Sequence, residues 1–251
     1  MPSTASPSPA ARAQPAAPAA GPTRFASVGS GLFPVFVAVM AVTLILSNIG
    51  ASKGVEIPIP MPWDPGFTLI TDGAFFLFPF AYIVGDVISE VYGFRASRRA
   101  ILTSFVLSVF AAGCYWLFIA LPGAVWYDGQ EALERTLGPV WLIVLASLLG
   151  FLVGQLANAF VMTRMKRRAG ERRLFGRIAA STGVGEFLDT LIFCSIAAGV
   201  IGIETFGQFV NYLVVGVFWK VFVELVFSPV TMAVMGMVKR AEPTYGQVTS
   251  A

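Results

Sequence analysis

The sequence predicts an all-α polytopic membrane protein, a bundle of six transmembrane helices with both termini in the cytoplasm. Three observations predict this fold. The 251-residue chain is 56% hydrophobic and only 12% charged, whereas soluble domains carry about 25% charged residues. Its apolar residues fall into six runs, each close to the ~20 residues that a helix needs to cross a bilayer. Most of its lysines and arginines lie in the segments that would face one side of the membrane.

The chain divides into three expected parts. Residues 1–30 are rich in proline and alanine and predict a disordered cytoplasmic tail, because such a composition cannot bury a core. Residues 31–240 form the expected transmembrane domain, and residues 241–251 a short cytoplasmic tail. The six spans are expected at 32–49, 73–92, 100–121, 139–163, 183–203 and 208–238.

The connections between the spans differ in kind. Residues 55–71 alternate weakly around a Pro-Trp-Asp-Pro-Gly centre, which predicts a hairpin-like loop. Residues 164–182 form a basic linker, in which we expect a short interfacial helix. The last run is too long for one straight span, so Pro229 predicts either a kink or an end that protrudes from the membrane.

The distribution of positive charge predicts the orientation. Seven of the 17 lysines and arginines lie at 164–182, three at 95–99, and two each in residues 1–30 and at 239–240. The opposite side has only Lys53 and Arg135. Cytoplasmic loops carry an excess of lysine and arginine, so both termini are expected in the cytoplasm. Because topology accounts for the basic linker, no nucleic-acid contact is expected.

Composition also excludes several kinds of chemistry. The chain has no histidine and two cysteines, so no histidine-based catalysis or zinc site can be built. We expect no enzyme activity, no cofactor and no metal. A remote alternative is an intramembrane aspartyl protease. Asp86 lacks the first glycine of the G-x-G-D motif, and Asp189 lacks the expected preceding tyrosine. A phosphate-binding G-x-x-x-x-G-K-[ST] motif is absent from the chain.

Ionisable residues inside the spans are the main functional candidates, because a charge at the centre of a membrane helix costs about 3 kcal/mol. They are Asp86, Glu90, Glu186, Asp189, Lys220 and Glu224. Asp86 and Glu90 are spaced i,i+4 and share one helix face. Either they pair with Arg95, Arg98 and Arg99 just beyond the span, or they line a polar cavity with the fifth span.

Each of the other candidates likewise has a structural and a functional interpretation. Glu186 and Asp189 open the predicted fifth span, where the helix dipole favours acids, or they line the polar cavity. Lys220 and Glu224 share a face near the middle of the last span and form either an ion pair or a ligand site. Trp219 beside them offers a stacking surface.

Four sequence blocks carry a resemblance to a known family. The longest is residues 78–93, which matches F-P-x-x-Y-x-x-x-D-x-x-x-E-x-Y-G. The others are Ser47-Asn48-Ile49 with Lys53, then Arg177 with Ser181-Thr182 and residues 189–193, and finally Lys220, Glu224 and Ser228-Pro229. Together they resemble the queuosine precursor transporters, within the vitamin uptake transporter group of bacterial six-span proteins. Ser228 stands where the family pattern has threonine.

The resemblance implies a function and a set of site residues. Such proteins import 7-cyano-7-deazaguanine and 7-aminomethyl-7-deazaguanine across the bacterial cytoplasmic (inner) membrane for queuosine synthesis in tRNA. For such a substrate, our hypothesis is that the binding residues are Asn48, Lys53, Trp219, Lys220 and Glu224, with Phe75 or Phe76 as further stacking partners. The alternative for Asn48 is that it caps the end of the first span. The residues of a gate or coupling site would be Asp86, Glu90, Glu186 and Asp189.

The residue chemistry agrees with such a substrate. A carboxylate can accept the adjacent N–H donors of a guanine-like edge as a pair, and an aminomethyl cation suits five intramembrane acids set against one lysine. The alternative is a substrate-binding subunit for another small base or vitamin that borrows a separate ATPase, a partner that we do not expect. Facilitated, proton-coupled and sodium-coupled transport stay open, as does the oligomeric state.

Overall fold

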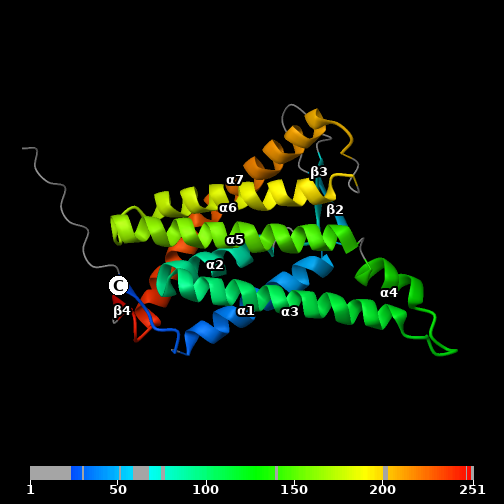
Figure 1. Cartoon of the computed structure of the whole chain (residues 1–251), viewed down its shortest axis with the longest axis horizontal. Coiled ribbons are helices and arrows are strands. Elements are labelled where there is room, and N and C mark those ends of the chain that lie inside the picture. The colour runs from blue at the N-terminus through cyan, green and yellow to red at the C-terminus, as the bar shows by residue number, and fades with distance from the viewer. Residues whose placement is uncertain are drawn as a thin grey trace, which may run out of the picture.

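Long helices packed side by side make up most of the protein, as the computed structural model shows (Figure 1). It describes residues 24–29, 31–50, 52–58, 68–74, 77–138, 141–199, 203–246 and 248–249. The helices in these residues are α1 (Leu32–Gly50), α2 (Phe78–Tyr92), α3 (Phe94–Ala120), α4 (Gln130–Leu137), α5 (Trp141–Ala169), α6 (Leu174–Ala197) and α7 (Phe206–Ala241). The strands are β1 (Arg24–Phe25), β2 (Gly54–Pro58), β3 (Thr68–Asp72) and β4 (Val248–Thr249).

Five of these helices are long and apolar enough to cross a membrane, namely α1, α3, α5, α6 and α7. The chain is therefore a multi-pass membrane protein. The expected second span at 73–92 corresponds to α2, which has only 15 residues. A helix of that length rises about 22 Å, which is less than the ~30 Å hydrocarbon core. Most of α2 is enclosed by the longer helices, since nearly every described side chain from residue 81 to 92 is buried.

The helices alternate in direction along the bundle. α1, α3 and α6 start at the end where the two described terminal strands lie, and α2, α5 and α7 end there (Figure 1). The basic segments at 95–99, 164–177 and 239–240 therefore gather at this end, which we call the basic end. The turn before β2, which contains Lys53, and α4, which contains Arg135, lie at the opposite end (Figure 1), as the charge pattern predicts.

The basic linker is the largest departure from the prediction. α5 continues to Ala169 and α6 begins at Leu174, so only four residues connect them and the expected interfacial helix at 164–182 is wrong. Lysine and arginine favour helix, so the basic residues extend both helices past the apolar part. Gly170 (φ 60°) ends α5 in the left-handed conformation that glycine adopts without strain.

The last helix runs without a break through Pro229. Its 36 residues span about 54 Å, well over the ~30 Å hydrocarbon core, so a kink at Pro229 or a protruding end stays the prediction. Pro229 has no N–H for the carbonyl of Leu225. The hydroxyl of Ser228 donates to that carbonyl at 2.7 Å instead and so satisfies it inside the membrane.

Short strands occupy both ends of the bundle. The predicted hairpin at 55–71 is confirmed, because β2 and β3 pair antiparallel from Gly54↔Asp72 to Pro58↔Thr68. At the basic end, β1 pairs with β4, and the Phe25 side chain is buried. Residues 1–23 of the predicted N-terminal tail lie outside the described residues. The short α4 was not anticipated.

Glycines bring α5 and α6 into close contact. Gly150 and Gly154 on α5 are spaced as in a G-x-x-x-G motif, which lets membrane helices approach closely. A Cβ on Gly154 would lie 2.8 Å from the carbonyl oxygen of Gly185 on α6, and a Cβ on Gly150 would lie 2.6 Å from Oδ1 of Asp189. This close packing fixes the position of Asp189, and with it of the neighbouring Glu186, on α6.

Candidate functional site

Polar side chains from four helices meet near the middle of the bundle. We call this group the central polar cluster. Its members come from α2, α5, α6 and α7 and are Tyr82, Asp86, Asn158, Thr182, Glu186, Asp189, Lys220 and Glu224. Four carboxylates therefore share the region with a single ammonium group.

Lys220 of α7 forms ion pairs across the helix interface. Its Nζ lies 2.6 Å from Oδ2 of Asp189 and 3.2 Å from Oε2 of Glu186, both on α6. α6 begins at Leu174, so these acids lie in the middle of the helix. The expectation that they occupy its first two turns, where the helix dipole would stabilise them, is therefore wrong.

Two other carboxylates of the cluster accept hydrogen bonds from neutral donors. Nδ2 of Asn158 donates to Oδ1 of Asp86 at 2.7 Å, and the hydroxyl of Thr182 donates to Oε2 of Glu224 at 2.7 Å. A narrow cavity of about 10 Å³ lies between them, lined by Tyr82, Ile83, Asp86, Ile178, Glu224, Phe227 and Thr231. Such a volume holds about one water molecule.

Two polar residues of α5 lie beside the central polar cluster and are not among the predicted site residues. Gln155 and Asn158 are fully buried, and neither amide atom of Gln155 has a hydrogen-bond partner among the described residues. Gln155 lies against Gly85, the neighbour of Asp86. Their signal in the sequence was visible, since they are the only strongly polar residues of the predicted fourth span.

A second group closes the basic end, and we call it the inner charge cluster. It centres on the buried Glu90, and its other members are Lys166, Glu171, Arg177, Lys239 and Tyr245. Arg177 of α6 and Lys239 of α7 approach Glu90 to 2.6 and 2.7 Å. The described residues show no ion pair between Glu90 and Arg95, Arg98 or Arg99, so that alternative is wrong.

Described residues from the first and last segments of the chain lie against this inner charge cluster. The ammonium of Lys166 lies over the rings of Phe25 and Tyr245, and the hydroxyl of Tyr92 donates to Glu242 at 2.8 Å. Partial burial alone would raise the pKa of Glu171. Hydrogen bonds from Lys239 and Tyr245, together with the charges of Lys166 and Lys239, instead lower it to about 2.

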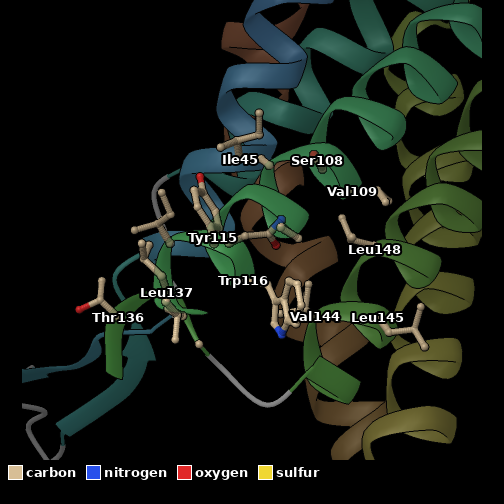
Figure 2. Close-up of a pocket in the computed structure, with 16 residues that line it drawn as sticks. Ile45, Ser108, Val109, Tyr115, Trp116, Thr136, Leu137, Val144, Leu145 and Leu148 are labelled. Carbon is tan, nitrogen blue, oxygen red and sulfur yellow. The ribbon is translucent and has the colours of Figure 1, made fainter. Parts of the chain in front are cut away.

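The remaining predicted site residues lie apart from the central polar cluster. Asn48 lines a larger cavity of about 350 Å³ between α1, α3, α4 and α5, whose walls are mostly apolar and include Tyr115 and Trp116 (Figure 2). Lys53 is exposed in the turn before β2. Trp219 is 45% exposed, and its ring packs against Phe222 with centroids 6.0 Å apart.

The structure thus divides the predicted site. It brings Lys220 and Glu224 together with Asp86, Glu186 and Asp189, and Glu90 lies in the inner charge cluster. Asn48 and Lys53 belong to other parts of the molecule, so their role in binding stays a prediction. Phe75 and Phe76 lie outside the described residues.

Comparison with known proteins decides the family. A family model described as "Putative vitamin uptake transporter" matches residues 72–234, more than half of the chain. The chain belongs to this transporter family. The resemblance found in the sequence is therefore confirmed, and the match favours a transporter over the aspartyl protease alternative.

A curated relative carries a more specific description. The transporter is 26% identical over 168 residues to the "Probable queuosine precursor transporter" of Bacillus subtilis (strain 168), a match that covers 64% of this chain and 70% of the relative. No solved structure matches this chain. The region matched by the family model contains every member of the central polar cluster and excludes Asn48 and Lys53.

Proposed function

We propose that this transporter imports the queuosine precursors 7-cyano-7-deazaguanine and 7-aminomethyl-7-deazaguanine, and that the central polar cluster binds them. The bacterial inner membrane and cytoplasmic termini are part of this proposal, supported by the basic residues at one end of the bundle. The observation that carries it is a polar cluster of four carboxylates, two of them paired with one lysine, inside the region shared with a transporter family.

The hydrogen bonds of the cluster suit a guanine-like base. Such a base presents adjacent N–H donors, which a carboxylate accepts as a pair. Asp86 and Glu224 now accept from Asn158 and Thr182, neutral donors that a substrate can replace. The aminomethyl form also brings a positive charge to a group of side chains that is rich in acids.

Binding requires the helices to separate. The cavity of about 10 Å³ between Asp86 and Glu224 holds about one water molecule, and a bicyclic base is far larger. In this proposal, the cluster has to open before it can accept the substrate. The inner charge cluster and the paired terminal strands would keep the basic end shut, and α2, α6 and α7 would move apart when the site opens.

Complementation tests the proposal. A bacterial strain that cannot make the precursors and lacks its own importer would express this chain alone. Each precursor would be supplied at low concentration, and queuosine in tRNA would be read on a boronate gel. We expect the signal to return. Loss of signal in Glu224→Ala, with the exposed Glu204→Ala unchanged and both proteins present in the membrane, would support Glu224 as a substrate ligand.

A second candidate is a membrane subunit that binds another small base or vitamin and depends on a separate ATPase. The "vitamin uptake" description of the family favours a vitamin as the substrate. The same assay separates the two, because the strain would supply no matching ATPase. An absent signal with the chain confirmed in the membrane would contradict independent import. Normal transport by both Asp86→Asn and Asp189→Asn would contradict a gating or coupling role for these acids.

A further inference from the structure

The larger cavity, of about 350 Å³, is separate from the central polar cluster, and the proposed function makes no use of it. It lies between the second halves of α1 and α3, the end of α4 and the start of α5, at the end of the bundle opposite the basic end (Figure 1). Pockets that bind small molecules have volumes of about 300–1,000 Å³. A bicyclic base therefore fits this cavity as it stands, whereas the space of about 10 Å³ between Asp86 and Glu224 is far too small.

A buried hydroxyl group in the wall of this cavity has no partner. Ser108 of α3 is 2% exposed, and its hydroxyl makes no hydrogen bond within the described part of the chain. Ser89 and Ser97 instead donate to the carbonyl four residues before them, which is a common way to satisfy a serine inside a helix. A buried polar group without a hydrogen bond is costly. A ligand that bonds to Ser108 would remove that cost.

The rest of the wall suits a flat molecule without charge. Tyr115 and Trp116 of α3 bring aromatic rings to the cavity, and Asn48 and Thr136 bring polar groups (Figure 2). Aromatic side chains stack on flat rings. None of the described residues that line the cavity is acidic or basic, so a charged ligand would lose its hydration there without gaining an ionic partner. The wall therefore favours a neutral heterocycle.

One face of α5 leads from the cavity to the central polar cluster. Leu148 lines the cavity, and Phe151 and Gln155 follow it on the same face, three and seven residues later. Phe151 is buried, and Gln155 lies against Gly85 of α2, next to the central polar cluster. A molecule in the cavity is thus about two helical turns away from the amide of Gln155, with Phe151 on the turn between them.

We propose that this cavity is an outer binding site, which holds neutral 7-cyano-7-deazaguanine before the base moves along α5 to the central polar cluster. This inference rests on the proposed function, because it takes its ligand and its direction from that transport. Ser108 bonds to a polar edge of the base, and Tyr115 or Trp116 stacks on its rings. The cationic aminomethyl form finds no acid in this cavity, so the outer site selects the cyano form.

Purified full-length protein in lipid nanodiscs tests the outer binding site. Labelled 7-cyano-7-deazaguanine would be titrated into the unmodified protein, into Ser108→Ala, and into Ala112→Phe, whose ring would fill the cavity that Ala112 lines. We expect the dissociation constant to rise at least threefold in Ser108→Ala and at least tenfold in Ala112→Phe. Unlabelled aminomethyl base should compete at least tenfold more weakly than unlabelled cyano base.

Val106→Phe is the matched control. Val106 also lies on α3, but it is 62% exposed and does not line the cavity, so binding should be unchanged. Unfolding midpoints would show that each variant folds, and the complementation assay would report import. We expect Ala112→Phe to lose import of the cyano base and Val106→Phe to keep it.

The possible outcomes separate this inference from the proposed function. Unmodified protein that neither binds nor imports either precursor overturns the proposed substrate and the inference with it. Normal binding and import in both Ser108→Ala and Ala112→Phe overturn the outer site and leave import standing. A phospholipid that native mass spectrometry detects on the unmodified protein, that Ala112→Phe removes and that the base does not displace assigns the cavity to an acyl chain and also overturns the inference.

Discussion

Arg177 and Glu90 form a two-point ion pair in the interior of the bundle. Nη1 of Arg177 lies 2.6 Å from Oε2 of Glu90, and Nη2 lies 3.0 Å from Oε1. Both residues are fully buried. Because Lys166 and Lys239 also contact Glu90, this single carboxylate holds together α2, α5, α6 and α7 at the basic end.

Removing the Glu90 carboxylate should therefore destabilise the protein strongly. Glu90→Ala leaves three cations without their shared partner, and breaking a buried pair in this way costs about 3–5 kcal/mol. The measurement is the unfolding midpoint of the purified protein in detergent. Lys239→Ala is the matched comparison and should cost less, because its side chain is partly exposed and the other contacts remain. Equal midpoints for Glu90→Ala and the unmodified protein would contradict the central role of this carboxylate.

The Glu171 carboxylate should make stability depend on pH in the acid range. Its pKa is lowered in the folded protein to about 2, from an ordinary value of 4.5. A lowered pKa means that the stabilisation is complete above the unfolded value and is lost as the pH falls from about 4.5 towards about 2. Unfolding midpoints measured across this range should show a smaller decline in Glu171→Gln. An identical decline in both proteins would assign the acid sensitivity to other groups.

The sequence predicts the helices best where apolar composition and helical structure coincide. The first span was expected at 32–49, and α1 is Leu32–Gly50. Hydropathy marks the part of a helix that contacts lipid, and the helix itself can continue beyond that part. α5 and α6 continue through basic residues that no apolar run includes. Glu186 and Asp189, which the hydropathy pattern places at the start of a helix, therefore lie in the middle of α6.

The sequence also identifies the acids of the site but not their partners. Spacing along one helix suggests the pair Lys220 and Glu224, because i,i+4 is the contact visible in a single segment. The observed contacts of Lys220 run to α6, and those of Glu90 run to three other helices. Which residues meet across an interface depends on how closely the helices pack, and the pattern of one helix does not specify that distance.

The glycine contact between α5 and α6 should be sensitive to a single methyl group. A Cβ on Gly154 would meet the Gly185 carbonyl oxygen and the Asp189 Cβ, each at 2.8 Å. Overpacking of this kind costs about 1–3 kcal/mol, and it would also displace Asp189 from Lys220. We expect Gly154→Ala to lower both the unfolding midpoint and the uptake of substrate.

Gly183→Ala is the matched control for this effect. It lies on α6, and a Cβ there meets nothing within 4 Å. Alanine is favoured over glycine in a helix by about 1 kcal/mol, so the midpoint should stay the same or rise. If Gly154→Ala and Gly183→Ala behaved alike in both measurements, close packing at Gly154 would not be what positions the α6 acids.

Replacing Gln155 should affect the stability of the protein and its transport activity in opposite directions. Both amide atoms are buried without a hydrogen-bond partner among the described residues, and each such atom costs about 1–3 kcal/mol. An apolar side chain of similar size removes that cost, so Gln155→Leu should unfold at the same or a higher temperature. If the amide serves to bind the substrate when α2 moves away from α5, uptake should fall at least tenfold in the same protein. Full uptake by a stabilised Gln155→Leu would show that the amide takes no part in binding, whereas a lowered midpoint would show that it stabilises the closed state.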